Sequence, residues 1–289
     1  MPAVYAFESL IGRKLAVTRH YPNWDYPGIP NDVIRESRRT GHIPLIAWRP
    51  QRQDNTWILW RDIANGLHDA EIDQTAANIK NWNRSAYFVF HHEPENAYRN
   101  HFQGTPGDPV ASGAEFQAAY AHIKQRFLSV GAVKMKWVAT LQRPTYDGSI
   151  GGSSAWFPLG SADLVGVDGY NRGACSGDKT WRSFATLFGS ARAFAAAHGI
   201  KMVVEEWGCV PTDACGGGVS TQTKAQWLTA AGLTIKSWPQ LKVVMYTHSL
   251  ADFRGSPVDF RVNSDPDSLT AYKAIGNDPY FGGTGPPIS

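Results

Sequence analysis

The sequence is poor in the features that mark membrane proteins and nucleic-acid-binding proteins. It has no apolar run approaching the length of a bilayer span and no dense cluster of Lys and Arg. Its 28 Lys and Arg are nearly balanced by 25 Asp and Glu, which leaves a formal net charge of only +3. We therefore predict neither a membrane partner nor a nucleic-acid partner.

The glycine motifs of nucleotide-binding proteins are also missing. No G-x-G-x-x-G follows the first predicted strand, and no G-x-x-x-x-G-K-[ST] occurs. The glycines of these motifs let the backbone approach a phosphate, so their absence removes support for nucleotide binding. We expect no cofactor and no resident metal.

Cysteine is scarce, with three residues in 289. Cys209 and Cys215 flank one loop, and Cys175 lies in another loop that is rich in Gly and Ser. The spacing matches no zinc pattern. A disulfide bond between two of the three fits a secreted protein, and three free thiols fit a cytosolic one. We expect an extracellular protein, and since no signal peptide precedes Ala3, its sequence here is the mature or trimmed form.

Core-forming residues are plentiful, because 43% of the chain is hydrophobic and only 18% is charged. We predict one domain over 1–289. Apolar runs that do not alternate with polar residues indicate strands covered on both faces, as in parallel sheets. The predicted strands are Leu15–Arg19, Ile43–Trp48, Tyr87–His91, Lys136–Thr140, Leu164–Asp168, Met202–Glu206 and Val243–Thr247.

Helix signals lie between these strands. Ser112-Gly113-Ala114-Glu115 is a capping box that opens a helix ending near Ser129, before Gly131. Other predicted helices are Ile72–Trp82, Thr180–His198, Gln222–Trp238 and Ser268–Ile275. The repeat predicts an α/β fold of the (β/α)8 TIM-barrel class. Seven strands are clear, so the first is weak or missing at the N-terminus; Ala3–Phe7 is either a weak strand or the start of a helix. The tail from Phe281 to Ser289 looks flexible.

Two of the predicted strands end in an acidic residue. Glu93 follows Tyr87–His91, and Glu206 closes Met202–Glu206. Burying a carboxylate without a partner costs several kcal/mol, so a purely structural reason for both is weak. In such barrels the active site lies at the C-terminal ends of the strands. Two carboxylates meeting there predict the hydrolysis of a glycosidic bond.

Four segments together resemble glycoside hydrolase family 26, a family of clan A retaining glycosidases known best for β-mannanases. The resemblance covers most of the chain, and the segments are Phe7–Arg13, His91-His92-Glu93, Asp163–Asn171 and Glu206-Trp207-Gly208. It implies that Glu93 is the general acid/base and Glu206 the nucleophile. It also implies that Tyr170 donates a hydrogen bond to Glu206, and that His92 contacts the sugar or places Glu93.

Aromatic and imidazole side chains near the strand ends complete the predicted substrate site. An indole offers a flat apolar face to a sugar ring and one N–H donor to a hydroxyl. The chain departs from the family pattern in having Pro94-Glu95-Asn96 after the acid/base, and Tyr246 or His248 where a Trp is common in clan A. Further predicted substrate contacts are His20, Trp24, Trp156 and Trp207, and core packing is the alternative for each.

Several interpretations remain open from the residues alone. His91, His92, Glu93 and Glu95 could suggest a metal site, although their spacing is not H-E-x-x-H. The two glutamates could instead form ion pairs at strand ends, for instance with Arg19, Arg49 or Arg143. The chain could also be a β-glucan or xylan hydrolase of clan A, or a non-catalytic carbohydrate-binding protein on a decayed barrel. We favour a monomeric, metal-independent, retaining endo-glycosidase acting on a β-linked polysaccharide, with β-mannan first.

Overall fold

A computed structural model describes residues 2–26, 31–96, 112–253 and 256–281. The chain divides into two compact units. The N-terminal unit comprises residues 16–166, and the C-terminal unit comprises residues 1–15 together with 167–284. The expectation of a single domain over 1–289 stays a prediction.

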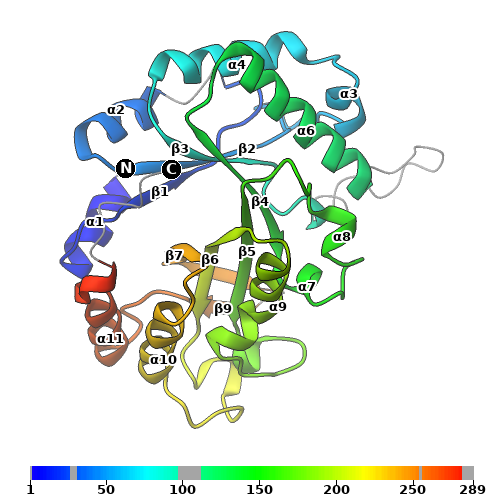
Figure 1. Cartoon of the computed structure of the whole chain (residues 1–289). Helices are drawn as coiled ribbons and strands as arrows, with labels where there is room; N and C mark the ends of the chain where they lie inside the picture. The colour runs from blue at the N-terminus through cyan, green and yellow to red at the C-terminus, as the bar shows by residue number, and fades with distance from the viewer. Residues whose placement is uncertain (1, 27–30, 97–111, 254–255, 282–289) are drawn as a thin grey trace. The chain divides into compact units, whose positions relative to one another are not determined.

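Seven strands form one sheet in the order of the chain, β1-β2-β3-β4-β5-β6-β7 (Figure 1). The pairings β1–β2, β2–β3, β3–β4 and β6–β7 are parallel. Helices alternate with these strands, as parallel connections require. The predicted (β/α)8-type fold is therefore confirmed, with seven strands in this sheet among the described residues.

The N-terminal segment settles the question of the first strand. Pro2–Ile11 is helix α1, and the first strand of the sheet is β1 at Val17–His20. Phe7 of α1 packs against the rings of His248 and Tyr272 at 4.6 and 6.0 Å between centroids. These contacts hold the segment as a helix on the C-terminal unit, so the interpretation of Ala3–Phe7 as a strand is wrong.

The N-terminal unit has an aromatic core between its strands and helix α6. Phe88 of β3 lies 4.7 Å from Trp137 of β4 and 5.0 Å from Phe127 of α6, between ring centroids. Burying aromatic side chains of this size is the main source of stability for such a layer. The elements of this unit are β1, α2 (Asn31–Thr40), β2 (Ile43–Trp48), α3 (Trp60–Ala64), α4 (Asp69–Trp82), β3 (Ala86–Phe90), α6 (Gly113–Val130), β4 (Met135–Gln142), α7 (Arg143–Tyr146) and α8 (Ser153–Trp156).

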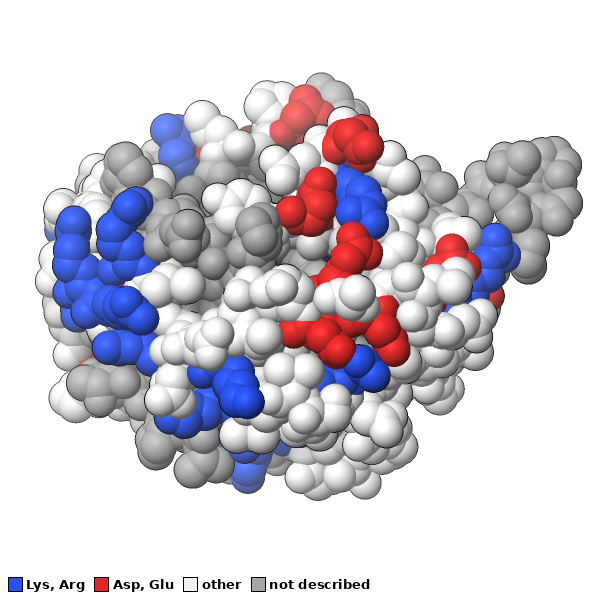
Figure 2. Space-filling view, turned by 90° about the horizontal axis from the view of Figure 1, so that it is seen from above, with Lys and Arg blue, Asp and Glu red and all other residues white. Residues whose placement is uncertain are grey.

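Helix α6 begins and ends where the sequence predicts. The Ser112 hydroxyl accepts from the Glu115 N–H, and the Glu115 carboxylate accepts from the Ser112 N–H, so the capping box forms. Gly131 ends the helix at a φ of 92°, which glycine adopts without steric cost. Arg126 of α6 pairs with Asp73 of α4. On the face that Figure 2 shows, several Asp and Glu side chains lie together, and a separate group of Lys and Arg side chains lies elsewhere on this face.

The C-terminal unit contains the last strands and four longer helices. Strand β5 (Leu164–Asn171) begins in the N-terminal unit and ends in this one. A two-stranded antiparallel hairpin that the sequence did not predict, β8–β9, follows β7. The other elements are α1, η1 (Gly173–Cys175), α9 (Phe184–Ala197), β6 (Lys201–Cys209), η2 (Ala214–Gly216), α10 (Lys224–Lys236), β7 (Leu241–Tyr246), β8 (Leu250–Phe253), β9 (Ser256–Asp259), α11 (Pro266–Asn277) and η3 (Pro279–Phe281).

The predicted strands all appear, with ends that differ by a few residues. The largest differences are at β4, β5 and β6, which run two to three residues beyond the predicted ends. Helix α9 begins at Phe184 rather than Thr180, because the Ser183 hydroxyl caps it by accepting from the Thr186 N–H. The tail after Phe281 lies outside the described residues. Among the described helices, none combines the length and apolar character needed to cross a bilayer.

Candidate active site

Glu206 lies in an irregular part of strand β6. Val204 pairs with Val244 and Trp207 with Tyr246, so three steps along β6 match two along β7. This is the geometry of a β-bulge, which inserts one residue and changes where the neighbouring side chains point. Glu205 is fully buried, whereas Glu206 is only partly buried. The bulge therefore separates two adjacent glutamates into different environments.

Tyr170 donates a hydrogen bond to the carboxylate of Glu206, as the sequence predicts. Tyr170 is near the end of β5, its hydroxyl contacts Glu206 Oε2, and the hydroxyl oxygen of Tyr170 also lies 3.2 Å from Thr247 Oγ1. Burial, together with the negative charges of Glu206 and Asp168, raises the pKa of Tyr170 well above its usual value. Tyr170 therefore stays protonated as a donor across the pH range in which enzymes work.

Asp168 adds a second carboxylate on the same strand. It is buried, at 3% exposure, and one of its carboxylate oxygens lies within 4.8 Å of one from Glu206. Two carboxylates this close repel each other when both are ionised. The hydrogen bond from Tyr170 is thus a stabilising contact for the Glu206 carboxylate.

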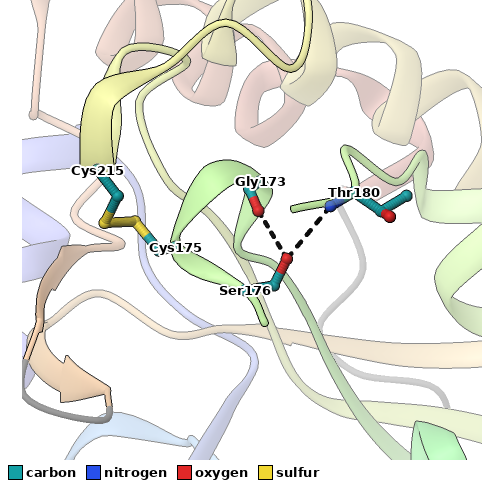
Figure 3. The surroundings of a disulfide bond; sticks show 5 residues. All are labelled: Gly173, Cys175, Ser176, Thr180 and Cys215. Atoms are coloured by element: carbon teal, nitrogen blue, oxygen red, sulfur yellow. Dashed lines mark hydrogen bonds between the residues drawn. A yellow bond between two sulfur atoms is a disulfide. The ribbon is translucent and has the colours of Figure 1, made fainter. Parts of the chain in front are cut away.

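A disulfide bond lies next to the hydrophobic cluster on which Tyr170 packs. Cys175 and Cys215 form a disulfide bond (Figure 3), and Cys209 is a buried free thiol. Cys175 and Tyr170 both pack on a cluster of Val210, Val258 and Phe260. The loop after Cys175 is tied by Ser176, whose hydroxyl donates to the Gly173 carbonyl at 2.6 Å and accepts from the Thr180 N–H at 3.3 Å (Figure 3). The disulfide thus stabilises the cluster on which Tyr170 packs.

The chain turns sharply where β3 ends. His91 and Glu93 both have a φ of 51°, in the left-handed region that non-glycine residues rarely adopt. The turn is held by backbone bonds to both neighbouring strands, from the His91 N–H to the Trp48 carbonyl at 3.0 Å and from the Glu93 N–H to the Thr140 carbonyl at 3.2 Å. Buried His91 accepts from Trp60 Nε1 at 2.9 Å. The strained turn separates the directions of the consecutive residues His91, His92 and Glu93.

Glu93 is partly buried and has polar partners in its own unit. Its Oε2 accepts from Gln142 Nε2 at 2.8 Å and from Asn96 Nδ2 at 3.4 Å. Gln142 is the last residue of β4, the strand next to β3. Among the described residues, the hydrogen-bond partners of the Glu93 carboxyl group are these two amides rather than an arginine, which weighs against the ion-pair alternative.

Three tryptophans predicted as sugar platforms are buried in the protein. Trp24, Trp156 and Trp207 are only 2%, 6% and 1% exposed. Trp24 stacks on Trp48 at 4.1 Å, and Trp207 packs against Phe184 and Tyr246 at 5.3 and 4.9 Å, between ring centroids. This burial corrects the expectation that these indoles offer an open face to a sugar, because large aromatic rings at strand ends also fill the core.

Two other predicted substrate contacts, His248 and Tyr246, bind or pack against residues of the C-terminal unit. His248 Nδ1 accepts from the Val262 N–H at 3.1 Å and its ring packs on Phe7. Burial and Arg261 lower the pKa of His248, which suits a neutral ring that accepts this bond. Burial raises the pKa of Tyr246, whose ring packs on Trp207 and Tyr272.

The remaining two predicted contacts lie at strand ends of the N-terminal unit. His20 is the last residue of β1, is partly buried, and has Nε2 3.1 Å from Thr18 Oγ1. His92 is partly buried beside Tyr21, with ring centroids 5.7 Å apart. Tyr21 is 43% exposed. The roles of His20 and His92 toward a substrate stay predictions.

Sequence reasoning missed Gln142 and Thr247, which contact Glu93 and Tyr170. Both lie at or just after strand ends, Gln142 closing β4 and Thr247 following β7. A polar residue at the end of an apolar run was the available signal, and it is the same signal that drew attention to Glu93. Glu93 belongs to the N-terminal unit and Glu206 to the C-terminal unit, so their meeting in one cleft stays a prediction.

Comparison with known proteins finds glycoside hydrolases. No protein-family model matches the chain. The chain is 26% identical over 283 residues, 95% of its length, to endoglucanase H of Acetivibrio thermocellus, and it spans 29% of that protein. The catalytic domain of the Bacillus sp. JAMB-750 GH26 endo-β-1,4-mannanase matches with a TM-score of 0.63 and 17% identity, over 95% of this chain and 79% of that one. A fungal β-1,4-galactanase matches with a TM-score of 0.64 and 14% identity, over 95% and 91%.

The fold is that of the barrel glycoside hydrolases, and the relatives with named activities are enzymes of this class. The predicted enzyme class agrees with the class of these relatives. The resemblance to family 26 extends to the fold, since a family 26 endo-mannanase is among the solved structures that share it.

Proposed function

We propose that the chain is a retaining endo-glycosidase that cleaves a β-linked polysaccharide by double displacement. Glu206 is the nucleophile and Glu93 the general acid/base in this proposal. The observation that carries it is the hydrogen bond from Tyr170 to Glu206. It stabilises an ionised carboxylate at the end of a barrel strand, where barrel enzymes have their active sites.

The reaction proceeds in two steps. In the first, a Glu206 oxygen attacks the anomeric carbon, the bond to the leaving sugar oxygen breaks, and Glu93 gives its proton to that oxygen. In the second, the ionised Glu93 takes a proton from water, whose oxygen attacks the same carbon and releases Glu206. The mechanism requires the two carboxyl groups to lie about 5–5.5 Å apart.

β-Mannan is the first substrate candidate, because the chain shares its fold with the Bacillus endo-β-1,4-mannanase. β-Glucan is the second, and the similarity to endoglucanase H favours it. Xylan is the third substrate candidate, and a non-catalytic carbohydrate-binding role is the competing function. A disulfide bond between Cys175 and Cys215 supports an extracellular location, since disulfides persist in oxidising compartments. We propose a monomer that acts outside the cell.

The test is reducing-sugar release from mannan, glucan and xylan by the wild type, Glu206→Ala and the control Asp267→Ala. Asp267 is an exposed acid of α11 in the same unit. We expect the wild type and the control to release oligosaccharides from one polymer, and Glu206→Ala to lose turnover while folding normally by circular dichroism. Full activity of Glu206→Ala would remove the nucleophile assignment. An inactive wild type that still binds a polysaccharide would favour the carbohydrate-binding role.

The acid/base role of Glu93 has its own test. Glu93→Ala should slow the kcat/KM of substrates with poor leaving groups most, because activated aryl groups depart without a proton. Initial rates on aryl glycosides of graded leaving-group acidity measure this. Equal losses across the series would count against Glu93 as the acid.

A further inference from the structure

A buried carboxylate lies two residues beyond Glu93. Glu95 is 0% exposed, and its Oε1 accepts from the backbone N–H of Gln142 at 2.5 Å and from the hydroxyl of Thr145 at 2.6 Å. Both donors lie where β4 ends and α7 begins. Glu95 therefore fixes the corner between these two elements from inside the N-terminal unit.

Gln142 contacts both glutamates. Its backbone N–H donates to Glu95, and its side-chain amide donates to Glu93 Oε2 at 2.8 Å. The backbone bond sets the position of the Cα atom from which the amide extends. Because that amide donates to Glu93, the position of Glu95 influences where the carboxyl group of Glu93 lies.

We propose that Glu95 and Gln142 form a positioning pair that holds the carboxyl group of Glu93 for proton transfer. This inference rests on the proposed function, in which Glu93 is the acid/base. Neither Glu95 nor Gln142 touches substrate in this role. Glu95 places Gln142, and Gln142 orients Glu93.

The contacts determine which oxygen of Glu93 carries the proton. Oε2 accepts from the amides of Gln142 and Asn96. A protonated carboxyl group has one O–H and one acceptor oxygen, so the proton of Glu93 resides on Oε1. The acidic O–H of Glu93 therefore lies on Oε1, to which neither amide donates, and it can be given to the leaving group.

Burial raises the pKa of Glu95 to about 7, and the nearby Glu93 charge adds to this, while the bonds from Thr145 and Gln142 oppose it. The groups that face Glu95 from β4 and α7, Gln142 and Thr145, are neutral, and Arg143 of α7 pairs with Asp147. The link from Glu95 to Glu93 therefore rests on the two hydrogen bonds that Gln142 donates.

Gln142→Met tests the orienting contact, since methionine keeps the length of the side chain and removes the donor. We expect kcat/KM for poor leaving groups to fall about ten-fold to one hundred-fold and kcat/KM for dinitrophenyl glycosides to stay near wild type. The control Gln117→Met removes an amide that bonds the Ala155 carbonyl on the surface, and it should change neither. Unchanged values for Gln142→Met, or equal losses on both substrate types, would overturn the positioning role.

Glu95→Leu tests the placement of Gln142, because leucine removes the oxygen that accepts both bonds. We expect kcat/KM for poor leaving groups to fall about ten-fold in Glu95→Leu. It should stay near the wild-type value in Glu95→Gln, whose amide oxygen still accepts the two bonds. Glu36→Leu is the control, as Glu36 is a buried glutamate of the same unit at 6% exposure. An unchanged kcat/KM in Glu95→Leu, or equal losses in Glu95→Leu and Glu95→Gln, would overturn this part.

¹³C NMR of glutamate carboxyl groups separates this inference from the proposed function. Glu93→Gln assigns the Glu93 signal. We expect the chemical shift of Glu93 to change in Gln142→Met and in Glu95→Leu, whether or not any polysaccharide is cleaved. No change in either variant would overturn the inference even for an active enzyme, and a change in an inactive protein would leave the pair standing while the proposed function failed.

Discussion

At the scale of single residues, two glutamates in similar sequence contexts have different partners. Glu206 meets the hydroxyl of Tyr170, with Asp168 close by, whereas Glu93 meets the neutral amides of Gln142 and Asn96. A hydroxyl whose pKa is raised is a persistent donor to an ionised carboxylate. This difference fits the assignment of Glu206 as the nucleophile and Glu93 as the residue that carries a proton.

Removing the Tyr170 hydroxyl should weaken catalysis with little effect on folding. Tyr170→Phe keeps the ring that packs on Phe260, 4.8 Å away between centroids, and deletes the bond to Glu206. We expect kcat/KM to fall about ten-fold to one hundred-fold, as measured by initial rates. Tyr146→Phe is the matched control, because it deletes a tyrosine bond to the Gly166 carbonyl. Equal losses in both variants would contradict a specific role for Tyr170.

The buried Glu95 should make stability depend on pH. Its pKa of about 7 in the folded state lies above the ordinary value of 4.5, so the folded state holds this proton more tightly than the unfolded state. The resulting stabilisation is complete below pH 4.5 and is lost as pH rises to about 7. The Tm of the wild type should therefore decline relative to Glu95→Gln over this interval. Parallel Tm curves from differential scanning calorimetry would contradict it.

At the scale of elements, a disulfide bond links the segments that follow β5 and β6. The Cys175–Cys215 bond joins η1 to η2 across 40 residues of sequence. It lies next to the Val210, Val258 and Phe260 cluster that also packs on Tyr170. A covalent link here limits the freedom of the unfolded chain and stabilises the cluster on which Tyr170 packs.

Breaking the disulfide should destabilise the protein substantially. For the Cys175→Ser, Cys215→Ser double variant we expect a loss of about 4 kcal/mol in the free energy of unfolding, from the loop-entropy relation. Urea denaturation measures it. Cys209→Ala is the control, because it removes a buried thiol and leaves the bond in place. A double variant as stable as the wild type would show that the bond does not constrain the fold.

At the scale of the whole molecule, one sheet of seven strands in chain order links the two units through β5. In both units, polar residues of interest lie near, at or just after strand ends, such as His20 at the end of β1 and Thr247 after β7. Barrel enzymes vary their chemistry through such positions while the strands supply a rigid frame. The proposed reaction uses only carboxyl groups and water.

In the proposed reaction two glutamates supply both the proton and the nucleophile, so activity should not depend on a metal ion. Dialysis against a chelator is expected to leave polysaccharide hydrolysis unchanged. Reducing-sugar assays before and after treatment, with re-addition of Ca²⁺, Mg²⁺ or Zn²⁺, check this. A loss restored by one of these ions would contradict metal independence.

The sequence by itself determined the order and type of the elements. Apolar runs of Val, Ile and aromatic residues predicted all seven strands, and the Ser112 capping box predicted the start of α6, because these signals are local in the chain. Residue identity at strand ends also pointed to Glu93 and Glu206, and the resemblance to family 26 pointed to Tyr170. Helix α1 was left open, since the contacts of Phe7 with residues more than 200 positions away decide it.

Only the tertiary structure decided the pairing and burial of side chains. It selected Cys175 and Cys215 from three cysteines, enclosed Trp24, Trp156 and Trp207, and joined Glu95 to Glu93 through Gln142. Each of these outcomes depends on which distant residues meet when strands pair and helices pack. Periodicity along the chain indicates which way a side chain points, but the long-range packing of the fold determines which residue that side chain contacts.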